Sequence, residues 1–197
     1  MTTKKKNRVL AIDDEPAMIE WLKILLEHEG YEVRTAMIGT RGEEIFKTWK
    51  PDVVVTDMML PDIDGLELLR RFKQTHPDTE VIVITGHGSV QKAVEAMKAG
   101  AFEFAEKPID ADALLAKLER AIERRDLLGE NLLLKQKIEN QFRFGNIIGK
   151  SKKMHEVLEL VESVAGSDAN ILIQGENGTG KELIANAIHY NSKRAKG

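Results

Sequence analysis

Five polar side chains stand at or just past the ends of short apolar runs: Asp13, Asp14, Asp57, Thr85 and Lys107. Three carboxylates that lay close together would repel one another, so at neutral pH they would need a cation. Magnesium is the expected ion, because the ligands are carboxylate oxygens and magnesium keeps several waters and room for a phosphate oxygen. A carboxylate can accept a phosphoryl group when a metal neutralises charge and the geometry is in line. We predict that Asp57 is this acceptor, with Lys107 supplying a cation and Thr85 a hydroxyl donor to the phosphate.

Alternating strand and helix patterns would bring these side chains together. The runs that indicate strands are Val9–Ile12, Tyr31–Ala36, Val53–Val55, Val81–Ile84 and Phe102–Ala105, and helical patterns lie between them, such as the one over Glu43–Trp49. Such alternation predicts a parallel sheet covered on both faces, here a flavodoxin-like α/β domain that ends near Arg125. Ligands of such sheets bind at the carboxyl ends of the strands, which is where the five polar residues fall.

A simpler interpretation treats the acids as structural. Asp14 could cap a helix that has Pro16 in its first turn, and Asp57 could be an ordinary loop acid. Capping does not account for the matching acid at Asp57 or for a lysine ahead of a proline at Lys107. We therefore favour the phosphoryl-transfer site.

A long helical pattern follows the sheet, from about Asp110 to Gln141. Its apolar residues fall on an alternating four-and-three spacing typical of a coiled coil, namely Leu114, Leu118, Ala121, Leu128 and Leu132. Arg125 and Lys135 interrupt this seam, and Gly129 lies inside the segment. A last helix with a charged linker and a dimerising coiled coil therefore both fit the pattern. We expect residues 1–125 to form the first domain, residues 126–141 a helical linker, and residues 142–197 a second unit.

The second unit contains a glycine-rich segment between a predicted strand, Ile171–Ile173, and a predicted helix. A helix from Ser151 to about Val164 precedes both. Glycines in this context expose backbone N–H groups to phosphates, and a lysine reaches the terminal ones. The candidate ATP-binding residues are Gly175, Gly178, Thr179, Gly180, Lys181 and Glu182. Glu182 stands where a P-loop has Ser or Thr, so the hydroxyl ligand for magnesium is missing from this incomplete site.

Composition sets broad limits on function. The 197 residues carry 42% hydrophobic and 31% charged side chains with a formal net charge of −3, which is ordinary for a globular protein. That charge does not favour a polyanion-binding surface. Cysteine is absent, which excludes disulfides and suits the cytoplasm. No apolar run approaches the roughly 18 residues of a membrane helix, so we expect no membrane association.

The segments Val9–Pro16, Val55–Gly65, Val83–Gly86 and Lys107–Pro108 resemble the receiver domain of two-component response regulators. The resemblance spans residues 7 to about 125. It implies phosphorylation of Asp57 by a partner histidine kinase. It also implies that Asp13, Asp14, Asp57 and the backbone carbonyl of Met59 hold magnesium, and that the Lys107–Pro108 peptide is cis. Thr85 and Phe104 match the pair that moves on phosphorylation in this family, although a core role for Phe104 is a close alternative.

The segments Phe144–Ser151 and Gly175–Glu182 resemble the start of the AAA+ domain of sigma-54-dependent activators of the nitrogen-regulator type. Members of that family commonly carry Glu after the P-loop lysine. The chain then ends at Gly197, before the acid run, arginine finger, sigma-contacting loop and helix-turn-helix of such proteins. We therefore expect a truncated AAA+ P-loop fragment without ATPase activity, and contacts to sigma-54 RNA polymerase and DNA only through absent regions.

These features together predict a phosphoacceptor signalling protein rather than an enzyme, although a receiver catalyses its own phosphorylation and dephosphorylation. Magnesium-dependent transfer to Asp57 would switch the receiver surface and control homodimerisation and a downstream AAA+ module. Two alternatives are a stand-alone receiver that drains phosphate and a self-contained ATP-binding enzyme. The missing acid run argues against the enzyme, and the P-loop segment argues against the stand-alone receiver.

Overall fold

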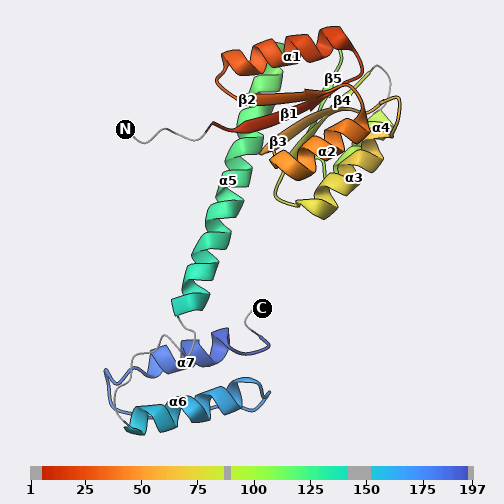
Figure 1. Ribbon diagram of the computed structural model, residues 1–197. Coiled ribbons are helices and arrows are strands. Elements are labelled where there is room, and N and C mark those ends of the chain that lie inside the picture. Colours follow the sequence, from red (N-terminus) through yellow and green to blue (C-terminus); the bar gives the residue numbers. More distant parts are fainter. Residues whose placement is uncertain (1–5, 87–89, 142–151, 195–197) are drawn as a thin grey trace. The chain divides into compact units, whose positions relative to one another are not determined.

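The computed structural model describes residues 6–86, 90–141 and 152–194, and it divides into two compact units, Met1–Gly129 and Glu130–Gly197 (Figure 1). The first unit is built on five strands: β1 (Arg8–Ile12), β2 (Glu32–Ala36), β3 (Val53–Asp57), β4 (Glu80–Thr85) and β5 (Glu103–Glu106). All neighbouring strands pair in parallel in the order β2-β1-β3-β4-β5. The flavodoxin-like sheet predicted from the sequence is confirmed.

Helices cover both faces of the sheet, as the buried Val and Ile runs require (Figure 1). One face packs against α1 (Pro16–His28) and the first part of α5 (Ala111–Gln141). The other face packs against α2 (Gly39–Trp49), α3 (Gly65–Thr75) and α4 (Val90–Lys98). Within the central strands β1 and β3, successive side chains enter the two cores in turn, so both cores fix the position of the strand ends that carry the polar residues.

The start of α2 differs from the prediction. The sequence pattern places this helix over Glu43–Trp49, but α2 begins at Gly39. Its N-cap residue, Ile38, makes no side-chain capping hydrogen bond. Asp62, from the loop that follows β3, accepts hydrogen bonds from the first two backbone N–H groups of α2 instead. The helix gains its extra turn from a residue distant in sequence, which the local pattern does not reveal.

The helix α5 runs without a break from Ala111 to Gln141, including Gly129. Its first apolar residues, Leu114, Leu118 and Ala121, are fully buried in the core of the first unit. Further along, the large apolar side chains are exposed: Leu127, Leu128, Leu132, Leu133 and Leu134. The predicted seam therefore has two parts, of which the first belongs to the receiver-like core and only the second is open to a partner.

Besides the end of α5, the described residues of the second unit form two helices, α6 (Lys152–Ala165) and α7 (Lys181–Tyr190), which pack against each other. The predicted strand at Ile171–Ile173 is wrong, because this segment has no regular structure. A strand needs a neighbour to satisfy its backbone groups, and the described part of this unit offers no other strand. None of the helices in the described residues is long and apolar enough to cross a bilayer.

Candidate phosphoacceptor site

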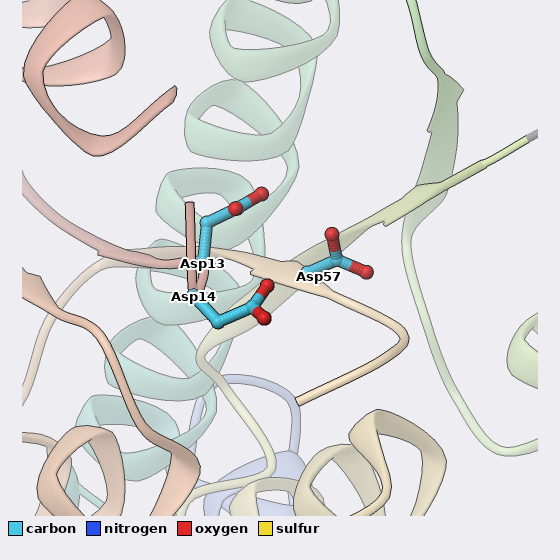
Figure 2. A group of neighbouring side chains, drawn as sticks. All are labelled: Asp13, Asp14 and Asp57. Atoms are coloured by element: carbon cyan, nitrogen blue, oxygen red, sulfur yellow. The ribbon is translucent and has the colours of Figure 1, made fainter. Parts of the chain in front are cut away.

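Four strand ends bring the predicted site residues to one edge of the sheet. Asp13 and Asp14 follow β1, Asp57 closes β3, Thr85 closes β4, and Lys107 follows β5. Because all the strands run parallel, these ends share the carboxyl edge. Figure 2 shows the three carboxylates beside one another at the ends of β1 and β3.

The three aspartates could hold a metal ion, since each offers a carboxylate oxygen and these oxygens all lie within 4.8 Å of one another. Asp13 and Asp57 are buried, whereas Asp14 is exposed. Burial raises the pKa of Asp13, against the lowering effects of the Glu15 backbone N–H and of Lys107. Among the described residues, no donor makes a hydrogen bond of good geometry to Asp13 Oδ2. A buried carboxylate oxygen with unused acceptor capacity, inside an all-oxygen ligand set, fits a hard divalent cation such as Mg²⁺.

Lys107 joins two of the carboxylates. Its Nζ lies 2.6 Å from Asp57 Oδ2, as a hydrogen-bonded ion pair, and 2.9 Å from Asp13 Oδ2, as an ion pair without hydrogen-bond geometry. Burial of the ammonium group lowers the pKa of Lys107, but the two neighbouring carboxylates, Asp57 and Asp13, outweigh this effect, and the net shift is upward. Lys107 is therefore a firmly charged cation at the centre of the pocket. The Lys107–Pro108 peptide is cis, as the family resemblance implies.

The loop after β3 folds back on Asp57 at the end of that strand. The backbone N–H of Met59 donates to Asp57 Oδ1 at 2.8 Å, and the N–H of Gly65 donates to the carbonyl of Met58 at 3.0 Å. A side chain at Gly65 would place its Cβ 2.5 Å from the carbonyl oxygen of Asp57, so only glycine allows α3 to begin this close to the acceptor strand. The loop thus holds one oxygen of Asp57 and leaves the other to Lys107.

The predicted switch pair differs in burial. Thr85 is 5% exposed, and its hydroxyl donates to the carbonyl of Gly86 at 3.2 Å. Phe104 is 36% exposed, and the ammonium of Lys117 lies 5.4 Å from the centre of its ring. The ring therefore stands at the surface, which does not fit the alternative of a buried core residue.

The glycine-rich segment of the second unit forms an exposed loop that leads into α7. Gly178 and Gly180 have φ of 82° and 87°, values that glycine adopts without strain, and Gly180 is the N-cap of α7. Lys181 Nζ donates to the carbonyl of Glu176 at 2.5 Å, so the lysine folds back onto its own loop. The N-terminus of α7 has no side-chain cap, which leaves backbone N–H groups for an anion.

One residue with a defined role at this edge was missed by the sequence analysis. Asp62 links the loop after β3 to α2 through three hydrogen bonds. These hydrogen bonds, foremost that of the Thr40 hydroxyl, lower the pKa of Asp62 to about 2. The only signal in the sequence is an extra acid in an acidic loop, which by itself indicates nothing about α2.

Comparison with known proteins places this α/β domain in a family. The family model described as the response regulator receiver domain matches residues 9–119, more than half of the chain. A second model, described as the sigma-54 interaction domain, matches residues 147–197, which include the glycine-rich loop. The chain therefore belongs to the response regulators of two-component systems, and its relatives are of the sigma-54 activator type.

Similar proteins cover almost all of the chain. It is 38% identical over 191 residues to the regulatory protein AtoC of Escherichia coli K12, and 41% identical over 194 residues to the C4-dicarboxylate transport transcriptional regulatory protein DctD of Pseudomonas aeruginosa. These matches cover 97% and 98% of the chain but only 41% and 42% of the two relatives. A crystal structure of NtrX from Brucella abortus in complex with ATP matches with 35% identity and a TM-score of 0.63, over 98% of this chain and 42% of that one. The chain thus spans about two fifths of the length of these proteins.

Proposed function

We propose that Asp57 is the phosphoacceptor of this response regulator, and that it receives a phosphoryl group from a phosphohistidine of a sensor kinase. The contact between Asp57 Oδ2 and Lys107 Nζ at 2.6 Å carries the proposal. It puts a nucleophilic oxygen beside a cation that can follow the incoming phosphate. In the transfer, the P–N bond to the imidazole breaks, a P–O bond to Asp57 forms, and the imidazole leaves with the electron pair of the broken bond.

The two oxygens of Asp57 have different partners, which supports a division of roles. Oδ1 is held by the backbone N–H of Met59, whereas Oδ2 has the long side chain of Lys107 as its partner. Oδ2 is thus the oxygen that can attack once Lys107 turns to the phosphoryl oxygens. Lys107 would remain within reach of Asp13, so its charge stays in the pocket throughout the transfer.

Magnesium is the proposed cofactor. Asp13, Asp14, Asp57 and the carbonyl oxygen of Met59 would hold it, and the ion would supply positive charge to the phosphoryl oxygens. The spacing of the three carboxylates supports this ligand set, as does the buried Oδ2 of Asp13, whose contact with Lys107 lacks hydrogen-bond geometry. The backbone N–H of Met59 and the side chain of Lys107 orient the carboxylate of Asp57.

Thr85 and Phe104 are proposed to pass the signal to the surface. A phosphoryl group on Asp57 would be a strong acceptor for the Thr85 hydroxyl, whose present bond to Gly86 is a local one that can be exchanged. Movement of Thr85 would open space behind β4, and the half-exposed ring of Phe104 could turn inward. The surface formed by β5 and α5 would change as a result.

The output is proposed to pass through α5. The exposed leucines beyond Arg125 support self-association of this helix as a homodimer, and the match to the sigma-54 interaction domain supports a downstream AAA+ module that acts on sigma-54 RNA polymerase. We further propose a cytoplasmic protein, in keeping with the transcriptional role of its relatives.

ATP binding by residues 175–182 is a second proposal. The uncapped start of α7 and the positive φ of Gly178 and Gly180 support a phosphate-binding loop, and NtrX of similar sequence is described in complex with ATP. Lys181 would have to leave the carbonyl of Glu176 to reach a phosphate. Glu182 still offers no hydroxyl for magnesium, so we propose a phosphoacceptor protein rather than an ATPase as the role of this chain.

Phosphorylation with a small phosphodonor and magnesium tests the proposal. We expect the intact mass to rise by one phosphoryl group, and Asp57→Asn to abolish the rise, because an amide oxygen is a poor nucleophile. Asp64→Asn, in the adjacent loop, is the control for loss of an acid nearby and is expected to label. Full labelling of Asp57→Asn would overturn the assignment.

A further inference from the structure

The helix α2 does not cap its own N-terminus. The first N–H groups of a helix have no partner inside it and are normally satisfied by a polar side chain at the N-cap. Here the N-cap residue is Ile38, whose side chain cannot accept a hydrogen bond. Asp62 supplies both oxygens instead: Oδ1 accepts from the N–H of Gly39 at 2.8 Å, and Oδ2 accepts from the N–H of Thr40 at 2.8 Å. The hydroxyl of Thr40 adds a third bond to Oδ2 at 2.7 Å.

The same loop also packs closely against the start of α2. A Cβ atom on Gly39 would lie 2.0 Å from Cγ2 of Ile63 and 3.3 Å from Cδ1 of Leu60. The distance to Ile63 is too short for a Cβ unless the loop moves, and the distance to Leu60 is tight. The tip of the loop after β3, residues 60–63, is therefore fixed to α2 by packing as well as by the carboxylate of Asp62.

The base of this loop is fixed to the phosphoacceptor strand. Met59 pairs with Asp64 in an isolated antiparallel bridge, and the N–H of Met59 donates to Asp57 Oδ1. The peptide that carries the Met59 carbonyl joins this base to the tip. Its orientation is thus restrained from both sides, by β3 at one end and by α2 at the other.

We propose that Asp62 is a positioning residue for the metal site: by tying the loop tip to α2, it holds the Met59 carbonyl in the direction that a magnesium ion requires. This inference rests on the proposed function, in which that carbonyl is a ligand. Groups that orient metal ligands affect affinity strongly, because a ligand that must be reoriented on binding costs free energy. The link also makes the start of α2 part of the phosphoacceptor site, although α2 contributes no side chain to it.

A role in capping and a role in positioning predict different results for a rescued variant. Asp62→Ala removes both the cap and the link to the loop. Adding Ile38→Ser gives α2 a cap from its own N-cap residue, where serine is favoured, but does not restore the link. Gly39→Ala retains the aspartate at position 62 but displaces the loop tip by steric contact with Ile63. Arg41→Ala is the matched control, since it removes an exposed ion pair with Glu44 on α2 and touches no part of the loop.

The experiment is a calorimetric titration of the unphosphorylated chain with MgCl₂, together with thermal unfolding of each variant. We expect the Kd for Mg²⁺ to rise about tenfold in Asp62→Ala, the low end of what loss of a supporting group costs a metal site. The Ile38→Ser, Asp62→Ala double variant should regain melting temperature but keep the raised Kd. Gly39→Ala should raise the Kd in the same direction, and Arg41→Ala should leave it unchanged.

Two results would overturn the inference. A wild-type Kd in Asp62→Ala would show that the base of the loop suffices to hold the carbonyl, and a wild-type Kd in the rescued double variant would reduce Asp62 to a helix cap. Either result would leave the proposed function intact, because each presupposes that the wild-type chain binds magnesium. Absence of any Mg²⁺ binding by the wild-type chain would instead remove the proposed metal site, and this inference with it.

Discussion

Arg125→Met measures how much the ion pair between Arg125 of α5 and Asp52, just before β3, contributes to the free energy of unfolding. Arg125 Nη2 lies 2.7 Å from Asp52 Oδ1, and the side chain of Asp52 is only 5% exposed. The other oxygen of Asp52 accepts the backbone N–H of Arg8 at 2.7 Å. Methionine keeps an unbranched apolar stem of similar reach and removes the charge. The substitution therefore leaves Asp52 buried with one backbone partner and no cation.

Loss of one partner from a fully buried ion pair costs about 3–5 kcal/mol, because the remaining charge is uncompensated. Two features reduce this value here. The side chain of Arg125 is 30% exposed, so water screens part of the interaction, and Asp52 retains the N–H of Arg8. We expect Arg125→Met to lower the free energy of unfolding by about 2 kcal/mol. A more exposed ion pair of the same helix, between Arg120 of α5 and Glu103 of β5 at 3.5 Å, should contribute less than about 0.5 kcal/mol.

Urea unfolding followed by tryptophan fluorescence is a suitable assay, since both tryptophans of the chain, Trp21 and Trp49, lie in the first unit. The double variant Asp52→Asn, Arg125→Met closes a thermodynamic cycle and should show a coupling energy well above the error of the method. The reasoning is refuted if Arg125→Met costs no more than Arg120→Met, or if the cycle shows no coupling with Asp52.

Two further predictions concern the pocket and α5. Lys107→Met removes the cation between Asp13 and Asp57, so without magnesium the variant should unfold at a lower temperature than the wild type. Added Mg²⁺ should raise the melting temperature of the variant more than that of the wild type. An equal rise in both proteins would contradict this prediction. Leu132→Glu should weaken self-association about a hundredfold by sedimentation, because two copies of a seam leucine are lost from the interface. Leu133 is 60% exposed against 51% for Leu132 and lies outside the predicted seam, so Leu133→Glu is the matched control, and equal dissociation of both variants would argue against a coiled coil.

The sequence predicts the main fold and pocket because their signals are local. Each apolar run is long enough to indicate a strand, and parallel pairing alone brings Asp57 and Lys107 together. The misses have a common cause in non-local contacts. The start of α2 depends on Asp62, which is 23 residues away from Gly39, and no pattern around Gly39 shows that partner. The apolar character of Ile171–Ile173 predicts a strand, but a strand also requires a neighbouring strand, which an apolar run does not reveal.

Arg125 lies between the buried and the exposed parts of α5. In the sequence it interrupts an apolar seam and weakens the prediction of a coiled coil. In the structure, its partner Asp52 lies in the loop before β3, so the residue that breaks the seam ties α5 to the first unit. Buried residues of the seam precede it and exposed leucines follow it. Residues of α5 before Arg125 thus complete the core of the first unit, and the exposed leucines after it are the ones that the proposed self-association would use. A signal that reaches the first part of α5 from Asp57 would change the second part through the backbone of a continuous helix.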